Sequence, residues 1–165
     1  MSKMNGDSRL YEILKELNID FEYCEHPAAP TIDAAKKHWK GIDATHCKNL
    51  FFRNHKGNRH YYVLLEHSKK LVISYLEKRL KQGKLTFASD KRLDKYLGLQ
   101  AGSVSPFGLI NDKNSEVHLF IDSDLQKANK ISFHPNINTA SLIISYSDFM
   151  RFLQWAGNSY EYFQA

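Results

Sequence analysis

Residues 46–67, with the sequence HCKNLFFRNHKGNRHYYVLLEH, decide how this protein folds. Two runs rich in aromatic and aliphatic residues, 46–54 and 60–67, are typical of strands. Segment 55–59, HKGNR, joins them and contains the glycine and asparagine that favour a tight turn. The stretch therefore predicts a β-hairpin.

Further helices and strands lie on both sides of the predicted hairpin. Asp7 and Ser8 can cap a first helix, whose apolar residues recur at helical spacing. Short links between several strands imply antiparallel neighbours, so the predicted fold class is α/β of the α+β kind, with a mixed, mostly antiparallel sheet flanked by helices. We expect helices over 8–18, 31–40, 75–83, 90–98 and 147–157, and extended segments over 20–26, 71–74, 85–89, 117–125, 130–136 and 139–145.

Segment 101–112, AGSVSPFGLIND, is the most unusual loop of the chain. Its glycines, serines and proline cannot hold a regular helix, and residues 107–110 are expected to begin a strand. For residues 158–165, NSYEYFQA, the sequence suggests no assignment.

Size and composition predict one folded domain over residues 1–165. The 165 residues have a mass of 19.2 kDa, and 42% of them are hydrophobic, which is enough to form a core. No apolar run reaches the roughly 18 residues of a membrane span, and the charged residues 1–9 lack the apolar centre of a signal peptide. We therefore expect a cytoplasmic protein, without membrane association, whose two cysteines are reduced thiols.

The net charge of +5 favours a polyanionic partner, although by itself this evidence is weak. Eight histidines raise the possibility of a metal site, but none lies at a recognised ligand spacing to another histidine, cysteine or carboxylate. We expect neither a metal nor a cofactor. Cys47 could act as a catalytic thiol, but it lies in an apolar run, where a buried and inert thiol is more common.

Lys48 is a stronger candidate for a functional residue. In an alternating strand its side chain shares a face with Leu50 and Phe52, which are expected to be buried. A lysine in that position needs an anionic partner. The alternative is an edge strand on which Lys48 extends to water.

The loop that begins at Gly102 is a candidate oxyanion site, because successive backbone N–H groups could face an oxygen that gains negative charge. A plain turn is the alternative interpretation. His134 precedes Pro135 at the end of a predicted strand and could be either structural or catalytic.

Four segments together resemble the prolyl-tRNA editing domain family, also called the YbaK or prolyl-tRNA synthetase associated domain. They are EHPAAPT at 25–31, CKNLFFRN at 47–54, GSVSPFGLIND at 102–112 and FHPNINTASL at 133–142. Their order and spacing match the family over nearly the whole chain. The resemblance implies a mixed α/β fold with a strongly curved sheet, no metal, and hydrolysis of the ester that joins a wrong amino acid to tRNA.

The resemblance also implies roles for individual residues. Lys48 matches a lysine thought to hold the phosphate or ribose of the terminal adenosine, and Gly102 and Pro106 match a GxxxP loop whose backbone would grip the aminoacyl carbonyl. His134 matches a histidine that shapes the amino-acid pocket. These four form the predicted catalytic set, and the other predicted substrate-binding residues are His26, Thr31, Asn49, Phe52, Ser103, Val104 and Ser105.

The predicted substrate is tRNA(Pro) that carries alanine. The wording KNLFFRN, with Asn49 after the lysine, resembles the alanine-specific branch of the family, and the free ribose hydroxyl of the substrate is expected to help activate water. Prolyl-tRNA synthetase is a second candidate partner, and DNA is not expected to bind. The predicted tRNA phosphate contacts are Lys36, Lys37, Lys40, Lys78, Arg79, Lys81 and Lys84.

Three alternatives remain open from the sequence. A deacylase specific for cysteine on tRNA(Pro) would use the same chain plan with a different pocket. A non-catalytic module that binds tRNA or a synthetase would keep the fold without turnover. A metal or thiol hydrolase of another ester would be inhibited by chelators or by alkylation of Cys47.

Overall fold

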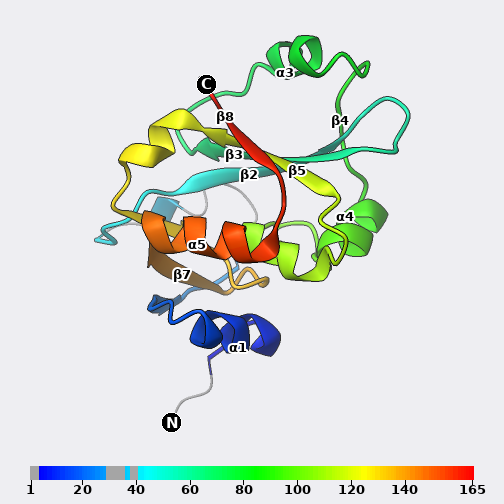
Figure 1. Cartoon of the computed structure of the whole chain (residues 1–165). Coiled ribbons are helices and arrows are strands. Elements are labelled where there is room, and N and C mark those ends of the chain that lie inside the picture. The colour runs from blue at the N-terminus through cyan, green and yellow to red at the C-terminus, as the bar shows by residue number, and fades with distance from the viewer. Residues whose placement is uncertain (1–3, 29–35, 38–40) are drawn as a thin grey trace.

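The computed structural model describes residues 4–28, 36–37 and 41–165, which form a mixed α/β domain with two sheets (Figure 1). The predicted hairpin is confirmed. Strand β2 (Cys47–Arg53) pairs antiparallel with β3 (His60–Glu66) over its full length. Asn54 stabilises the turn, because its side-chain oxygen accepts hydrogen bonds from the N–H groups of Asn58 and Arg59.

The larger sheet has the strand order β4-β2-β3-β5-β8. The three other strands are β4 (Thr86–Phe87), β5 (Val117–Asp122) and β8 (Tyr160–Phe163). β4 pairs antiparallel with β2, whereas β5 pairs parallel with both β3 and β8. This sheet is therefore mixed, as the sequence predicted.

The smaller sheet has the order β1-β7-β6, and all its pairs are antiparallel. Its strands are β1 (Glu22–Glu25), β7 (Ala140–Ser145) and β6 (Lys130–Phe133). Thr45, just before β2, forms a parallel bridge with Ile131 of β6 and connects the two sheets. The mostly antiparallel pairing is confirmed, but the strands form two bridged sheets rather than one.

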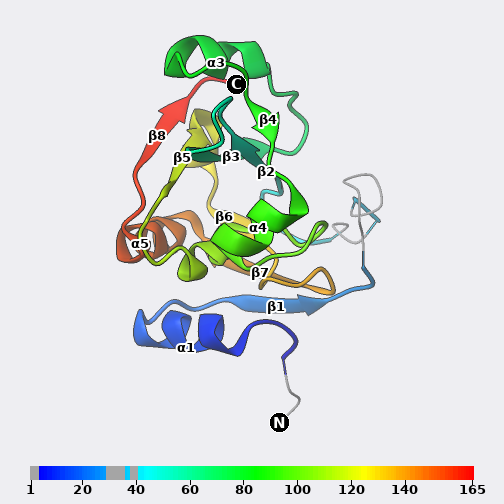
Figure 2. The same ribbon diagram turned by 90° about the vertical axis from the view of Figure 1, so that its right-hand side faces the viewer.

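Four α-helices and two 3₁₀ helices of the described chain complete the fold. The α-helices are α1 (Ser8–Glu16), α3 (Ile73–Leu80), α4 (Asp90–Leu97) and α5 (Tyr146–Ala156). The 3₁₀ helices are η1 (Pro106–Asn111) and η2 (Ser123–Lys127). Figure 2 shows α3 above the larger sheet, α5 between the two sheets and α1 below the smaller sheet. No described helix is long and apolar enough to cross a membrane.

The hairpin separates two hydrophobic cores, because successive side chains of a strand point to opposite faces. Phe51, Tyr62 and Leu64 belong to the main core, which also includes residues of α1, α4 and α5. Phe52 and Leu65 belong to a second core beneath α3. The prediction that Phe149, Phe152 and Leu153 of α5 point inward is confirmed, since all three are buried.

Several assignments differ from the sequence predictions. Residues 123–125, expected to be extended, belong to η2. Residues 71–74 do not form a strand, because α3 begins at Ile73 and buries Leu76 in the second core. Residues 107–110 belong to η1 rather than to a strand, since Ser105 caps Phe107 and Pro106 occupies the first turn. The unassigned C-terminal segment contributes β8. The predicted helix 31–40 lies mostly outside the described residues.

Removal of the Phe163 side chain tests whether β8 is an integral part of the fold. Phe163 is buried against Phe120, so Phe163→Ala is expected to lower the free energy of unfolding by about 3 kcal/mol. Tyr160→Ala, in the same strand but at an exposed position, is the control and is expected to cost less than about 1 kcal/mol. Urea denaturation measures both, and equal losses would contradict the packing described here.

Acid is expected to destabilise the protein through His60. Burial, with Arg92 as the next cause, lowers the pKa of His60 to about 4, and Arg92 Nη1 donates to its Nε2 at 3.0 Å. Between pH 6.5 and about 4 the unfolded chain takes up a proton at His60 that the folded chain refuses, so stability falls as the pH falls. The variant His60→Gln is expected to show a shallower loss in this window, measured by urea denaturation at several pH values.

Candidate active site

Three loops from separate parts of the chain meet where β1 ends and β7 begins. Glu25 pairs with Ala140, so His26 lies beside the 134–139 turn, at the end of the smaller sheet seen in Figure 2. The rings of His26 and His134 are 5.8 Å apart. The predicted histidines are thus brought together by strand pairing.

His134 is held as a neutral ring with a defined tautomer. Its Nδ1 lies 2.8 Å from the carbonyl oxygen of Ala140, which can only accept, so Nδ1 carries the proton. Burial lowers the pKa of His134, and nearby His26 adds to that effect. The other nitrogen, Nε2, is therefore an acceptor that can bind a donor group of a ligand.

His26 is oriented by two contacts. Its Nδ1 donates to the carbonyl oxygen of Pro27 at 2.9 Å, and its Nε2 lies 2.8 Å from the hydroxyl of Ser141 on β7. Both contacts tie the ring to the end of the smaller sheet. His26 thereby forms a fixed side of the space next to His134.

The 98–105 loop supplies exposed backbone donors. Gly102 has φ +87°, a left-handed conformation that favours glycine, and only Asn138 would meet an added Cβ. The N–H of Ser103 already donates to Gln100. The N–H groups of Ala101, Gly102, Val104 and Ser105 form no hydrogen bond with another described residue, so those of Gly102 and Val104 are among the donors that this loop can offer to an oxyanion.

The 134–139 turn holds this loop in position. Asn136 has φ +64°, and its side-chain amide donates to the carbonyl oxygen of Phe107 in η1 at 3.4 Å. An added Cβ at Gly102 would lie 3.6 Å from the amide nitrogen of Asn138. The 98–105 loop and the 134–139 turn therefore lie side by side.

Lys48 lies close in sequence to the bridge between the two sheets. Thr45 forms this parallel bridge with Ile131. Lys48 follows Thr45 by three residues, and His134 follows Ile131 by three residues. The Lys48 ammonium donates to the carbonyl oxygen of Lys69 at 2.5 Å. The predicted anionic partner is thus absent among the described residues, and a carbonyl dipole alone leaves the ammonium able to bind an anion.

A charged network anchors the segment that receives Lys48. The side chain of Asp122 is fully buried at the end of β5 and accepts from Lys69 at 2.9 Å and from the N–H of Glu66. Lys69 also binds the exposed carboxylate of Asp124 at 2.6 Å, and both carboxylates raise the pKa of Lys69. The network holds the backbone carbonyl of Lys69 where Lys48 reaches it.

Other predicted substrate-binding residues have different environments. Phe52 is fully buried in the second core and stacks on Phe87, so we correct its assignment to the amino-acid pocket. Asn49 accepts from Tyr62 at 2.7 Å on the opposite face of β2 from Lys48, and its role in binding remains a prediction. Ser103 and Ser105 are buried in the glycine loop, whereas Thr31 lies outside the described residues.

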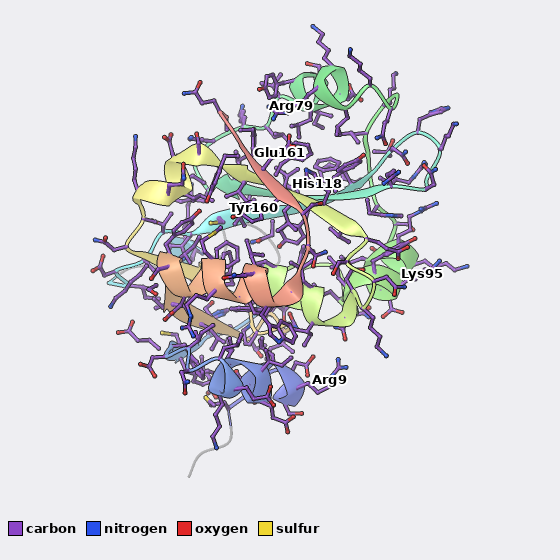
Figure 3. All side chains as sticks on the ribbon, in the orientation of Figure 1. Arg9, Arg79, Lys95, His118, Tyr160 and Glu161 are labelled. Atoms are coloured by element: carbon purple, nitrogen blue, oxygen red, sulfur yellow. The ribbon has the colours of Figure 1, made fainter. Side chains whose placement is uncertain are left out.

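The predicted tRNA contacts do not form one group. Arg79 forms an ion pair with Glu161 of β8 at 2.6 Å, and Figure 3 labels both residues. Lys40 lies outside the described residues. The other described members of the set, all exposed, are Lys36, Lys37, Lys78, Lys81 and Lys84.

The structure disfavours a thiol mechanism. Cys47 is buried, and this burial raises the pKa of its thiol far above the ordinary value, with Glu66 and Asp122 adding to the effect. A thiolate is therefore strongly disfavoured at neutral pH. Both cysteines are free thiols. In the described parts of the chain, no three His, Cys, Asp or Glu side chains are close enough to hold a metal ion.

Sequence reasoning missed Lys69, Asp122 and Asn136. Asp122 ends an apolar strand, a position where a carboxylate must be paired if it is buried, and this signal could have been noticed. Nothing near Lys69 or Asn136 in the sequence indicates their long-range contacts.

The fold is a mixed α/β domain, and the comparisons with known proteins identify its class as an editing domain. The family model "Aminoacyl-tRNA editing domain" matches residues 26–152, and the chain belongs to this family. Editing of an aminoacyl-tRNA is hydrolysis of its ester, so the protein is an enzyme of the aminoacyl-tRNA hydrolase class.

Proteins similar in sequence or structure give more detail on this editing class. The prolyl-tRNA editing protein ProX of Acetoanaerobium sticklandii is 37% identical over 96% of both chains. Prolyl-tRNA synthetase associated domain-containing protein 1 of Danio rerio is 31% identical over 88% of this chain and 79% of its own. A solved structure described as a candidate trans-editing enzyme for prolyl tRNA synthetase shares the fold with TM-score 0.69 and 19% identity, over 98% of this chain and 99% of its own.

The two carboxylates that bind Lys69 give a matched test of the charged network. Asp122→Asn removes the charge of a buried partner and is expected to lower the free energy of unfolding by about 3 kcal/mol. Asp124→Asn removes the charge of a partner whose side chain is 52% exposed and is expected to cost about 0–1 kcal/mol. Urea denaturation at pH 7 measures both losses. Equal effects would show that burial of Asp122 is not decisive.

Proposed function

We propose that the whole chain, residues 1–165, acts as one trans-editing deacylase that hydrolyses the ester of Ala-tRNA(Pro). The carrying observation is that the loop of Gly102 and Val104, whose two N–H groups have no partner among the described residues, lies beside the turn that contains His134, a neutral acceptor. Family membership and the names of the similar proteins support tRNA(Pro) as the tRNA. The proposal includes action in the cytoplasm and contact with prolyl-tRNA synthetase.

Each part of the surface has a role in the proposed reaction. The N–H groups of Gly102 and Val104 bind the carbonyl oxygen as water attacks and negative charge develops on it. Pro106 has no N–H and begins η1, which ends the loop in a rigid turn. Lys48 binds the phosphate or ribose of the terminal adenosine, and His26 and His134 border the amino-acid pocket.

The proposed mechanism uses the substrate to activate water. The ribose hydroxyl next to the ester is close to the reacting carbonyl in any aminoacyl-tRNA, and it can orient or deprotonate the attacking water. Neutral Nε2 of His134 can accept a hydrogen bond from this hydroxyl or from the substrate ammonium. A protein nucleophile is not part of this scheme, in agreement with the buried thiol of Cys47.

Alanine is the proposed target because a synthetase pocket built for proline excludes a smaller side chain poorly. Loss of a methylene group changes binding by only about 1–3 kcal/mol. A second and smaller pocket can admit alanine and reject proline by steric clash. Cysteine on tRNA(Pro) is the second candidate substrate, since its side chain is also small and the same surface would serve it.

The first experiment measures deacylation of tRNA(Pro) that carries alanine, cysteine or proline. We expect rapid loss of alanine only, with no effect of a chelator. Lys48→Gln is expected to lower kcat/KM about 10- to 100-fold, because it removes one charged hydrogen bond to the substrate. Lys15→Gln, at an exposed position of α1, is the control and should retain full activity.

Each other outcome has a distinct meaning. Preferential loss of cysteine would keep the mechanism and change the substrate. Binding of tRNA without hydrolysis of any ester would favour a non-catalytic module. A folded Lys48→Gln variant with full activity would refute the proposed role of Lys48.

A further inference from the structure

Three segments far apart in the sequence lie together at one end of the larger sheet. They are the β2–β3 turn, the loop between α3 and β4, and the helix α4, which share the right-hand side of the molecule in Figure 1. Arg92 of α4 donates to the carbonyl oxygen of Gly57 in the turn at 2.8 Å. Asn54 of the turn donates to Gln82 of the loop at 3.0 Å. Direct hydrogen bonds therefore hold the three segments as one unit.

This end of the molecule carries a concentration of positive charge. We call it the basic end, defined by the exposed residues Lys56, Arg59, Lys81, Lys84, Lys91 and Lys95. None of these six forms an ion pair with a described residue. The exposed carboxylates on α4 are Asp90 and Asp94, so the excess of positive charge is large. Figure 3 shows Lys95 pointing away from the body of the protein.

An exposed aromatic ring lies within the same unit. Phe87 of β4 is 58% exposed, although one face of its ring stacks on buried Phe52 at 4.5 Å. In sequence it lies between Lys84 and Lys91. Cations interleaved with an exposed aromatic ring are typical of surfaces that bind single-stranded nucleic acid and its phosphates.

The basic end is directly connected to the candidate active site. Helix α4 ends at Leu97, and the loop that contains Gly102 follows it without an intervening element. Asn111 of η1 donates to the carbonyl oxygen of Leu97 at 2.9 Å, which fixes the end of α4 against the far end of this loop. A polyanion that enters the site through its terminal ester can therefore continue over α4.

We propose that the basic end binds the backbone phosphates of the substrate tRNA next to its aminoacylated terminus, with Phe87 as a stacking surface for an unpaired base. This inference rests on the proposed function, and it extends the binding surface from α3 to the β2–β3 turn and α4. Among the residues predicted from the sequence, Lys81 and Lys84 belong to this surface. Arg79 does not, because Glu161 already neutralises it.

The test compares two charge-matched variants in binding to uncharged tRNA(Pro) at increasing salt. Lys91→Gln/Lys95→Gln removes two charges from the basic end, and Lys15→Gln/Lys127→Gln removes two exposed charges from α1 and η2, which lie outside every predicted tRNA contact. For the first variant, we expect the slope of log affinity against log salt to decrease by about 2, one for each lost phosphate contact. The second variant should keep the wild-type slope.

A second measurement separates this inference from the proposed function. The first variant should lose kcat/KM with full-length Ala-tRNA(Pro) but retain it with alanine esterified to free adenosine, which has no backbone phosphate for the basic end to bind. Wild-type protein that binds tRNA without deacylation would refute the proposed function alone, since the salt slopes would still report the surface. Phe87→Leu should weaken binding without a change in slope.

Two results would overturn the inference. Equal slopes for both variants would mean that only the net charge attracts tRNA. Unchanged tRNA binding by the first variant, with editing lost only when prolyl-tRNA synthetase is present, would assign the basic end to a protein partner instead.

Discussion

The pairing of β2 with β3 is the interaction on which the rest of the structure depends. Its seven residue pairs bury both faces of the hairpin, so that one set of side chains completes the main core and the other completes the core under α3. A shift of the register by one residue would exchange these two sets and expose the wrong side chains to each core. The same register also determines that Lys48 opposes Leu65 and points toward the segment that Asp122 anchors.

The candidate site lies where the hairpin meets the smaller sheet because neither sheet is closed there. The backbone of Thr45 forms a parallel bridge with Ile131. Because the bridge is parallel, the segments that follow it, toward Lys48 and toward His134, leave it in the same direction. Loops that leave strand ends carry polar groups which are not used by a ladder, and such groups remain available for a ligand. Two rigid sheets thus support a surface of backbone donors and ring nitrogens.

Local patterns in the sequence predicted the regular elements well. The hairpin, the capped helix α4 and the inward face of α5 follow from turn residues, Ser89 and apolar spacing, all of which act within a few residues. The strand predicted at 71–74 was wrong, because the burial of Leu76 in the second core, whose members include the distant residue Phe163, favoured the helix. Long-range packing of this kind has no local signal. The same limit explains why β8 had no assignment.

Prediction of the site was limited by the difference between residue type and environment. Phe52 is close to candidate residues in the sequence. Side chains alternate between the two faces of β2, however, and the side chain of Phe52 lies in the second core, away from solvent. The histidines behave in the opposite way: His26 and His134 are 108 residues apart but become neighbours through β1 and β7. The sequence motifs indicate which residues are candidates, whereas the strand register determines which of these residues lie close enough to act together.

The charged groups around Lys48 and Lys69 are arranged so that an anionic ligand could pair with Lys48. Among the described residues Lys48 has a carbonyl dipole as its partner and no carboxylate, while nearby Lys69 binds two carboxylates. If the carboxylates bound Lys48 instead, a phosphate would have to displace them and would lose most of the Coulomb attraction. Lys69 therefore binds Asp122 and Asp124, and the ammonium of Lys48 has no carboxylate partner among the described residues. An anionic ligand is the group that this distribution of charge stabilises most.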